Sequence, residues 1–295
     1  MILLTPTSWK DYELIDTGDG EKLERFGEYI LRRPEPQAVW DKSLKEKEWE
    51  VLYHAYFRRE KSQQKESEKG EWILKSGVPG QWFVNYKWNN LTMKMRLGLT
   101  AFKHVGIFPE QAENWNYIYQ TILDLKIENP RVLNLFAYTG GASLSARAAG
   151  ADVVHVDSVK QVINWSSENQ QASDLEGIRW VVEDALTYVK REVKRGKTYH
   201  GIILDPPAYG RGPDGEKWIL EENINELLKL CSQLLEKEKA FFVLNLYSMG
   251  FSSLIADNLA MSHFHNTNHQ EFGELYVQDK SGKRLPLGVF LRFRK

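Results

Sequence analysis

Val132-Leu-Asn-Leu-Phe-Ala-Tyr-Thr-Gly-Gly141 decides the fold of this 295-residue chain. It is an apolar run that ends in a glycine pair, and three further apolar runs end in carboxylates: Val153-Val-His-Val-Asp157, Trp180-Val-Val-Glu-Asp184 and Ile202-Ile-Leu-Asp205. Runs of this length are typical of strands buried on both faces, and the helical segments between them predict a parallel α/β sheet. Because ligands bind at the carboxyl ends of such strands, we expect the four polar ends to share one edge.

The alternation of strand and helix continues on both sides of this stretch. We expect strands starting near residues 131, 153, 179, 201 and 240, with helices between them. The runs Glu274–Gln278 and Leu287–Phe293 flank a turn and predict a closing antiparallel hairpin. The predicted fold class is α/β, with a doubly wound, mostly parallel seven-stranded sheet, a C-terminal β-hairpin and a small β-rich domain in front.

Residues 1–104 are predicted to form that β-rich domain, which would bind substrate, and residues 105–295 the α/β domain. The first part shows period-two apolar runs that predict strands: Tyr12–Ile15, Lys22–Phe26, Tyr29–Arg33, Val51–Phe57, Glu71–Leu74, Trp82–Tyr86 and Leu91–Leu97. The polar run Arg58–Gly70 contains no apolar residue, so we interpret it as an exposed hairpin loop.

The composition restricts the function classes. A formal net charge of -1 supplies no overall positive field, so a polyanionic partner must be bound by a local patch. The single cysteine, Cys231, excludes an intramolecular disulfide and a multi-cysteine metal site. The histidines show no metal-ligand spacing, so no metal is expected. Without a long apolar stretch or a signal sequence, the chain is predicted to be cytoplasmic and not membrane-bound.

The segment Tyr138-Thr139-Gly140-Gly141 follows the first strand of the sheet and leads into a helix. Glycine lets the backbone approach a ligand closely, and a helix N-terminus offers free N–H groups to an anion such as an amino-acid carboxylate. A tight strand-to-helix turn would use the same residues.

Two carboxylates end the next strands. Asp157, with Ser158 beside it, follows Gly140 at close to the offset of about 20 residues at which dinucleotide folds bind ribose hydroxyls. Asp184 could accept from the amine of an adenine, with the backbone of Ala185 next to it. Both have structural alternatives: a chance strand end for Asp157 and a helix N-cap for Asp184.

The most specific signal is Asp205-Pro206-Pro207-Ala208-Tyr209. Proline has no N–H, so this turn presents carbonyls that can only accept. Asp205 and the Pro206 carbonyl could therefore bind an amino group and orient its nitrogen for attack, while Tyr209 offers a face on which a base can stack. A rigid turn with a capping aspartate is the structural alternative.

Weaker candidates for substrate binding lie nearby. Asn245 and Tyr247 are predicted to follow the fifth strand, and Arg211 could pair with a phosphate. Ordinary loop contacts would explain these residues equally well. One basic cluster stands out, which a helix C-terminus could also account for: Lys190, Arg191, Lys194, Arg195 and Lys197.

From residue 102 to the C-terminus the chain resembles the class I S-adenosylmethionine-dependent methyltransferases, and among them the large-subunit ribosomal RNA cytosine methyltransferases. The resemblance rests on these motifs, which are specific as an ordered set: Asn134-Leu-Phe-Ala-Tyr-Thr-Gly-Gly141, Val156-Asp157, Glu168-Asn169, Glu183-Asp184 and Asp205-Pro-Pro-Ala-Tyr209. It implies S-adenosyl-L-methionine as the cofactor, bound by Phe136, Tyr138, Gly140, Asp157 and Asp184. It also implies that Asp205 and Pro206 lie at the methyl-accepting end, and it makes Gln111 a candidate cofactor contact.

Two departures from the family pattern affect the predicted chemistry. The general signature has an acidic residue and three alternating glycines after the first strand, whereas Asn134, Phe136 and Tyr138 occupy three of these places. Methylation of cytosine C5 requires a cysteine nucleophile. The Asp205–Tyr209 motif contains none, and Cys231 is predicted to lie in a helix core. We therefore expect direct transfer, to a nitrogen of a base in RNA and most plausibly ribosomal RNA.

Three alternatives remain open. The acceptor could be an amine of a small molecule or protein, which the near-neutral charge favours. The chain could also be a catalytically silent module that binds RNA or a protein, although such a module needs neither Asp157 nor Asp205. A nicotinamide enzyme is disfavoured because Gly-x-Gly-x-x-Gly is absent after the first strand. The sequence does not determine the oligomeric state.

Overall fold

The computed structural model describes residues 1–7, 9–59, 69–247 and 250–295. The chain divides into two compact units, each built from separate stretches of sequence. Unit 1 comprises Met1–Leu4, Gln111–Leu275 and Leu287–Lys295, and unit 2 comprises Thr5–Glu110 and Tyr276–Pro286. The tip of the last hairpin thus belongs to the second unit, although its base belongs to the first.

Unit 1 is built on an eight-stranded sheet. Its strands, in spatial order, are β1 (Ile2–Leu4), β16 (Asn268–Gln278), β17 (Arg284–Arg294), β15 (Phe241–Leu246), β12 (Gly201–Leu204), β9 (Arg131–Leu135), β10 (Asp152–Asp157) and β11 (Ile178–Val182). The five strands from β15 to β11 are parallel, and β17 is antiparallel to β15. The seven predicted strands are confirmed, and β1 adds an eighth, pairing parallel to β16 at the edge.

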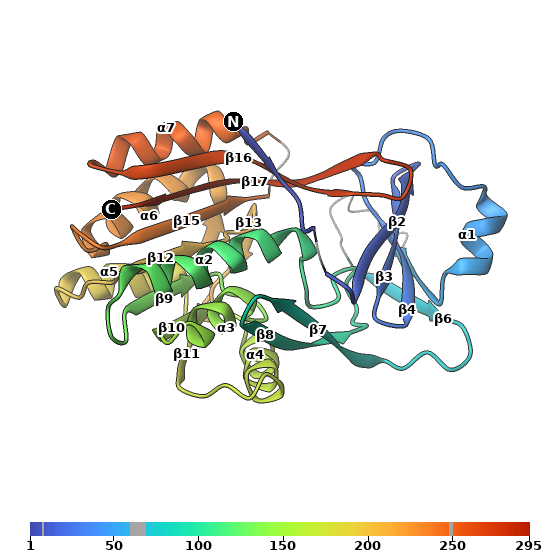
Figure 1. Cartoon of the computed structure of the whole chain (residues 1–295), viewed down its shortest axis with the longest axis horizontal. Helices are drawn as coiled ribbons and strands as arrows, with labels where there is room; N and C mark the ends of the chain where they lie inside the picture. Colours follow the sequence, from blue (N-terminus) through green and yellow to red (C-terminus); the bar gives the residue numbers. More distant parts are fainter. Residues whose placement is uncertain (8, 60–68, 248–249) are drawn as a thin grey trace. The chain divides into compact units, whose positions relative to one another are not determined.

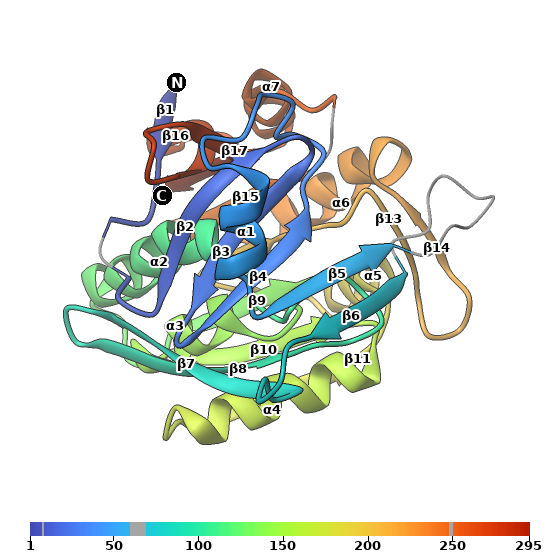
Figure 2. The ribbon, with the colours of Figure 1, turned by 90° about the vertical axis from the view of Figure 1, so that its right-hand side faces the viewer.

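In the described part of unit 1, six α-helices cover the two faces of this sheet (Figures 1 and 2). They are α2 (Ala112–Leu125), α3 (Gly141–Ala148), α4 (Lys160–Ala172), α5 (Ala185–Lys194), α6 (Leu220–Leu234) and α7 (Ser253–His263). Helices α5, α6 and α7 share an apolar core with Leu133 and Leu135 of β9, whereas Asn134 between them faces α3. Figure 1 shows α2 and α3 in front of the sheet and α6 behind it.

The strand order positions the functional edge. Strand β9 comes first in the sequence of the parallel strands, and the chain proceeds to β10 and β11 on one side before it returns to β12 and β15 on the other. The direction of winding therefore reverses between β9 and β12. In doubly wound sheets, ligands bind outside the carboxyl ends of the strands at this switch point.

Unit 2 contains a five-stranded sheet and a separate two-stranded ribbon. The five strands are β2 (Tyr12–Gly18), β3 (Glu21–Phe26), β4 (Tyr29–Pro34), β5 (Ala55–Arg59) and β6 (Gly70–Leu74), and the ribbon pairs β7 (Gln81–Trp88) with β8 (Leu91–Gly98). The predicted loop at residues 58–70 falls largely outside the described residues. A 3-10 turn, Pro109–Gln111, ends the segment that follows the ribbon.

The prediction of a strand over Val51–Phe57 is wrong in its first half. Residues Glu46–Leu52 form helix α1, and the strand begins only at Ala55. Glutamate, lysine and leucine favour a helix here, and Trp49 is fully buried against Ile15 and Leu23. A tertiary contact by one side chain therefore outweighs the alternating pattern.

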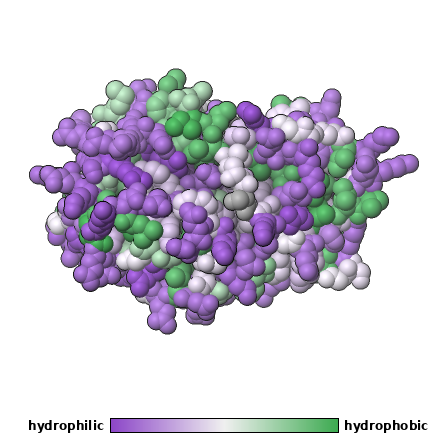
Figure 3. Space-filling view, in the orientation of Figure 1, coloured by the Kyte–Doolittle hydropathy of each residue, from purple (hydrophilic) through white to green (hydrophobic). Residues whose placement is uncertain are grey.

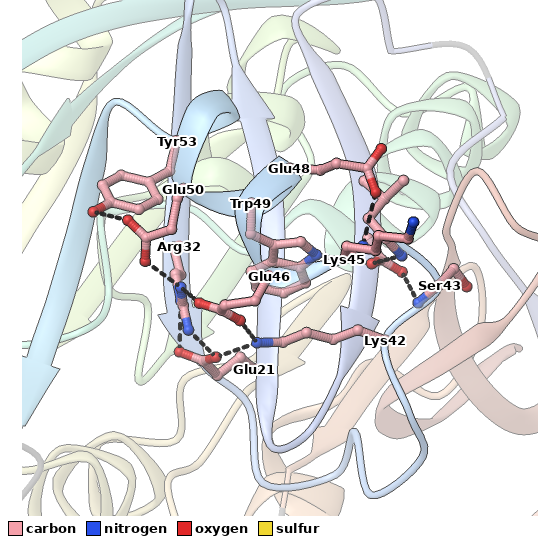
Figure 4. Close-up of polar contacts among 12 residues, drawn as sticks. Glu21, Arg32, Lys42, Ser43, Lys45, Glu46, Glu48, Trp49, Glu50 and Tyr53 are labelled. Carbon is pink, nitrogen blue, oxygen red and sulfur yellow. Dashed lines mark hydrogen bonds and ion pairs between the residues drawn. The ribbon is translucent and has the colours of Figure 1, made fainter.

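Polar contacts fasten α1 to the sheet (Figure 4). The Trp49 indole N–H donates to Asp16 Oδ2 at 2.8 Å, and Arg32 and Lys42 both bind Glu21 and Glu46 beside the indole ring. Burial alone would raise the pKa of Asp16, but hydrogen bonds from the Leu44 backbone and from Trp49 hold this pKa below its ordinary value.

The face of the molecule drawn in Figure 3 is mostly polar. A hydrophobic patch lies where Figure 1 places the amino terminus, and Met1, Ile2 and Leu3 are exposed there. Among the residues that the structure describes, no helix has the length and apolar character needed to cross a membrane.

We predict that Trp49→Ala lowers the free energy of unfolding of unit 2 by about 3–5 kcal/mol, because it opens a cavity and removes one of the hydrogen-bond donors to the buried Asp16 carboxylate. Urea denaturation followed by circular dichroism measures the change. Val51→Ala, on an exposed side chain of the same helix, is the control and is expected to change stability by less than about 0.5 kcal/mol. Equal stability of the two variants would contradict the anchoring of α1 by Trp49.

Candidate active site

The loop between β9 and α3 has an unusual backbone. Phe136, Tyr138 and Gly140 all have positive φ values of 54°, 48° and 92°. A left-handed conformation costs a non-glycine residue about 1–2 kcal/mol, and bulky side chains rarely adopt it. The positions at which the general signature carries alternating glycines thus keep a glycine-like backbone, although Phe136 and Tyr138 have large side chains.

Three hydrogen bonds hold this loop in place. The Tyr138 N–H donates to Asp157 Oδ2 at 2.9 Å, and the Ser166 hydroxyl donates to the Tyr138 carbonyl at 2.6 Å. The Asn169 amide donates to the Thr139 carbonyl at 2.9 Å. Both Ser166 and Asn169 lie on α4, so hydrogen bonds from this helix hold the loop in place. These bonds offset the energetic cost of the positive φ values.

A buried histidine completes the support. The ring of His155 on β10 lies 2.9 Å from the Ser143 hydroxyl, which also accepts from the Asn134 amide. Burial lowers the pKa of His155 to about 3, so the ring is neutral and acts as a structural hydrogen-bonding group. The sequence contained a signal for this network, because Asn134 and His155 are polar residues within otherwise apolar strands. The structure shows that the two residues pair across β9 and β10.

The two glycines serve different purposes. Gly140 caps α3 in the left-handed region, which favours glycine. At Gly141 an added Cβ would lie 2.7 Å from the Trp115 ring of α2, so the missing side chain permits close packing of two helices. Gly141 is therefore explained by packing, and Gly140 by the left-handed conformation at the N-cap of α3.

Asp157 ends β10 and already has two backbone partners. Its Oδ2 accepts from Tyr138 and its Oδ1 from the Val159 N–H at 3.0 Å. Burial raises the pKa of Asp157 in spite of hydrogen bonds from Val159, Tyr138 and Ser158. Each carboxylate oxygen has two lone pairs, so the group can still accept from a pair of hydroxyls. Backbone bonds fix its orientation for that purpose.

Asp184 is the N-cap of α5, as its structural alternative predicted. Its Oδ1 accepts from the Thr187 N–H at 2.8 Å, and within the described parts of the chain no hydrogen bond to Oδ2 occurs. Ala185 is buried as the first residue of the helix. The neighbouring Glu183 forms a two-point ion pair with Arg191.

Asp205 follows β12 and differs from the other two carboxylates. No hydrogen bond to its side chain occurs within the described part of the chain, and desolvation by burial raises its pKa to about 7. The Pro207 carbonyl accepts from the Trp218 indole at 2.7 Å, and the Ala208 carbonyl accepts from the Leu220 N–H at 3.0 Å. The Pro206 carbonyl has no such partner among the described residues.

The chain beyond the prolines forms a small hairpin of β13 (Tyr209–Arg211) and β14 (Lys217–Ile219). The ring of Tyr209 is 52% exposed and so is available for stacking. Arg211 donates to the Tyr209 hydroxyl at 3.2 Å. The two predicted substrate residues are thus in contact with each other.

Gln111, Asn114 and Asn245 form a cluster of amides. Gln111 Oε1 accepts from Asn114 at 3.1 Å and from Asn245 at 2.7 Å, and Asn114 also donates to Asn245 Oδ1 at 2.9 Å. The prediction that Asn245 follows the strand is wrong, because Asn245 lies inside β15, one residue before its end, and is buried. The structure brings two predicted residues together through Asn114, which the sequence analysis missed. Tyr247 follows the strand and is 40% exposed.

Cys231 is fully buried in α6, as predicted, and burial raises the pKa of its thiol. The basic cluster on α5 is largely paired: Lys190 binds Glu226, Arg191 binds Glu183 and Arg195 binds Glu192. Within the described residues, no group of three or more His, Cys, Asp or Glu side chains is arranged to hold a metal ion.

A family profile described as S-adenosylmethionine-dependent methyltransferase matches residues 59–259. The chain is therefore a member of this methyltransferase family. It is an enzyme of the class I fold that uses S-adenosyl-L-methionine, which confirms the resemblance found in the sequence. The left-handed Gly140 at a helix N-terminus and the oriented Asp157 carboxylate suit a ligand with one anionic group and a ribose.

Solved structures and curated relatives agree with this assignment. The S-adenosylmethionine-dependent methyltransferase from Agrobacterium tumefaciens has a TM-score of 0.90 and 34% identity, covering 100% of this chain and 93% of that one. The methyltransferase SMU.776, solved with S-adenosylhomocysteine, has a TM-score of 0.69 at 18% identity, covering 97% of this methyltransferase and 76% of that chain, and shares the fold.

The ribosomal RNA large subunit methyltransferase K/L of Shewanella frigidimarina is 30% identical over 139 residues. The match covers 46% of this methyltransferase but only 18% of that relative. The protein described here thus spans a small part of the length of this curated relative.

We predict that Asp157→Ala weakens binding of S-adenosylhomocysteine about 100-fold, because it removes two charged hydrogen bonds to hydroxyls and the acceptor that holds the Tyr138 N–H. Isothermal titration calorimetry measures the affinity. Asp152→Ala is the matched control, since Asp152 is exposed at the opposite end of the same strand. Wild-type affinity in Asp157→Ala would show that this carboxylate does not contact the ligand.

The raised pKa of Asp205 predicts a stability change with a defined sign. Between about pH 4 and pH 7 the folded protein holds a proton that the unfolded chain has released, so stability falls as the pH rises through this range. Asp205→Asn should therefore stabilise the protein at pH 8 by about 1–2 kcal/mol, or about 2–6 °C in Tm, and by much less at pH 5. Differential scanning calorimetry at both pH values checks this, and an equal Tm of both proteins at pH 8 would contradict it.

Proposed function

We propose that this methyltransferase transfers a methyl group directly to a nitrogen of a base in RNA, with ribosomal RNA as the expected substrate. One observation carries the acceptor chemistry. Asp205 lies at the switch point of the sheet next to Pro206, and among the described residues neither its carboxylate nor the Pro206 carbonyl has a hydrogen-bond partner. Two acceptors at this place suit an amino group that must be oriented before it attacks.

The cofactor half of the proposal uses the loop after β9 and the ends of β10 and β11. The N-terminus of α3 at Gly140 receives the carboxylate of the methionine moiety, Asp157 accepts from both ribose hydroxyls, and Asp184 Oδ2 accepts from the adenine amine. Further contacts are proposed from the neighbouring residues: Phe136, Tyr138, Thr139, Gly141, Ser158, Ala185 and Gln111.

The acceptor half uses Asp205 and the Pro206 carbonyl, which accept the hydrogens of the amino group. These bonds hold the nitrogen lone pair in line with the methyl group, and they favour loss of a proton once the nitrogen becomes cationic. The exposed ring of Tyr209 stacks on the base, with Arg211, Asn245 and Tyr247 as further substrate contacts. When bound, S-adenosyl-L-methionine would supply the methyl group, which its sulfonium activates for transfer.

Nitrogen is preferred over carbon because of Cys231. A covalent route to C5 of cytosine needs an accessible thiolate, whereas the only thiol of the chain is fully buried and its pKa is raised. A carboxylate and a carbonyl can instead serve an amine, which is nucleophilic without a covalent intermediate.

The RNA substrate is supported by the name of the Shewanella relative and by the exposed Tyr209 beside Arg211. We include in the proposal that residues 1–104 help to bind this substrate and that the protein acts in the cytoplasm. The runner-up is an amine of a small molecule or protein, which the formal net charge of -1 favours.

The test is mass spectrometry of RNA nucleosides from a strain that lacks the gene and from complemented strains. We expect one N-methylated nucleoside to disappear and to return with the wild-type gene or Cys231→Ser. It should not return with Asp205→Ala, although that variant should bind S-adenosylhomocysteine within about 3-fold of wild type.

Two outcomes would contradict the proposal. An unchanged set of methylated nucleosides in the deletion strain would favour the small-molecule or protein amine. An inactive but folded Cys231→Ser protein would point to a covalent route through the thiol.

A further inference from the structure

A single buried tryptophan connects the two halves of the proposed site. Trp218 lies in β14 and is 3% exposed. Its ring centroid is 4.7 Å from that of Phe136, with the planes inclined at 53°, and its indole N–H donates to the Pro207 carbonyl at 2.7 Å. Phe136 follows β9 and Pro207 follows β12, so the indole contacts both loops that flank the switch point.

On the cofactor side, Trp218 supports a strained residue. Phe136 has a φ of 54°, which a bulky side chain adopts only when its surroundings hold it there. The tilted arrangement of the two rings is one of the favourable geometries for aromatic pairs. Contact with Trp218 therefore helps to maintain the left-handed turn that carries Tyr138 and Gly140.

On the acceptor side, the hydrogen bond from Trp218 determines which backbone carbonyl of the turn can still bind a ligand. Pro206 and Pro207 have no N–H groups, so the backbone of this turn cannot be fixed by its own donors. The indole binds the Pro207 carbonyl and the Leu220 N–H binds that of Ala208. The Pro206 carbonyl and the Asp205 carboxylate, which have no hydrogen-bond partner among the described residues, are thus acceptors available to a ligand.

Trp218 is itself held firmly. It belongs to the apolar core that includes Leu220 and Ile224 of α6 and Leu204 of β12. Across the hairpin its partner is Gly210, where an added Cβ would lie 3.6 Å from the Pro207 ring and 3.7 Å from Trp218 Cβ. The backbone of β13 therefore lies against both residues, and the indole has a rigid base from which to position the two loops.

We propose that Trp218 is a positioning residue that couples the cofactor loop at Phe136 to the acceptor turn at Asp205–Pro207. The inference rests on the proposed function and deepens it, because it explains how the two half-sites are kept in register. Loss of the indole N–H frees the Pro207 carbonyl, lets the turn rotate, and weakens the recognition of an amino group more than the recognition of the cofactor.

The test compares two ligands in calorimetric titrations at pH 8. S-adenosylhomocysteine lacks the transferred methyl group, whereas sinefungin carries an amine near that position and so reaches Asp205 and the Pro206 carbonyl. We expect wild type to bind sinefungin about 10-fold more tightly than S-adenosylhomocysteine. In Trp218→Phe, which keeps a ring but has no donor, this preference should fall below about 3-fold, with S-adenosylhomocysteine affinity within about 3-fold of wild type.

A purely structural role would alter both affinities alike, so the ratio isolates the positioning effect. Phe136→Leu, which breaks the ring contact but keeps the indole donor, should also reduce the preference and serves if Trp218→Phe does not fold. Trp82→Phe is the matched control, because it removes another indole bond to a backbone carbonyl, that of Phe26 in unit 2. The Trp82→Phe variant should prefer sinefungin over S-adenosylhomocysteine by the same factor as wild type.

An unchanged preference in both Trp218→Phe and Phe136→Leu would overturn the coupling while leaving the proposed function intact. If wild type bound both ligands equally, the acceptor role of Asp205 and the coupling would both be wrong. If wild type bound neither ligand, the cofactor half of the proposed function would fall together with this inference.

Discussion

The site depends on the loop between β9 and α3, whose backbone is held in the left-handed region by hydrogen bonds from Asp157 and from helix α4. Phe136 and Tyr138 have no intrinsic preference for positive φ, and each costs about 1–2 kcal/mol there. The Asp157 carboxylate and the Ser166 hydroxyl bind the N–H and carbonyl of Tyr138, and Trp218 packs on Phe136. Bonds to a charged acceptor contribute about 1.5–3 kcal/mol, enough to offset the strain. Asp157 thus orders the loop at the carboxyl end of β10.

Buried polar groups have two different uses in unit 1. His155 is neutral and fully engaged with its neighbours, so it adds rigidity without carrying charge. Asp205 is desolvated but has no hydrogen-bond partner among the described residues, so its ionised form is unfavourable in the free protein. A ligand amine would supply the missing donors. In the proposed function, the same carboxylate that reduces stability at neutral pH would bind the acceptor amine, which is a common relation between stability and function.

Much of this arrangement could be predicted from the sequence. The seven strands, the hairpin at the end, the burial of Cys231 and the N-cap role of Asp184 all follow from local patterns. The errors have physical causes. Helix α1 was missed because the burial of Trp49 outweighs a period-two pattern, and β1 because three residues carry too little pattern to assign. Asn114 and Trp218 were missed because their partners are distant in sequence.

The sequence by itself determined the class of sheet, the identity of the cofactor and the set of carboxylates at the strand ends. Periodicity and short motifs are local properties, so they can be recognised in the sequence without knowledge of the fold. Only the tertiary structure decided which acceptors remain available. The partners that engage Pro207, Asn245 and Asp157 come from other segments of the chain, and a hydrogen bond between distant residues leaves no trace in a local pattern. Long-range pairing therefore converts a row of polar strand ends into a site with defined donors and acceptors.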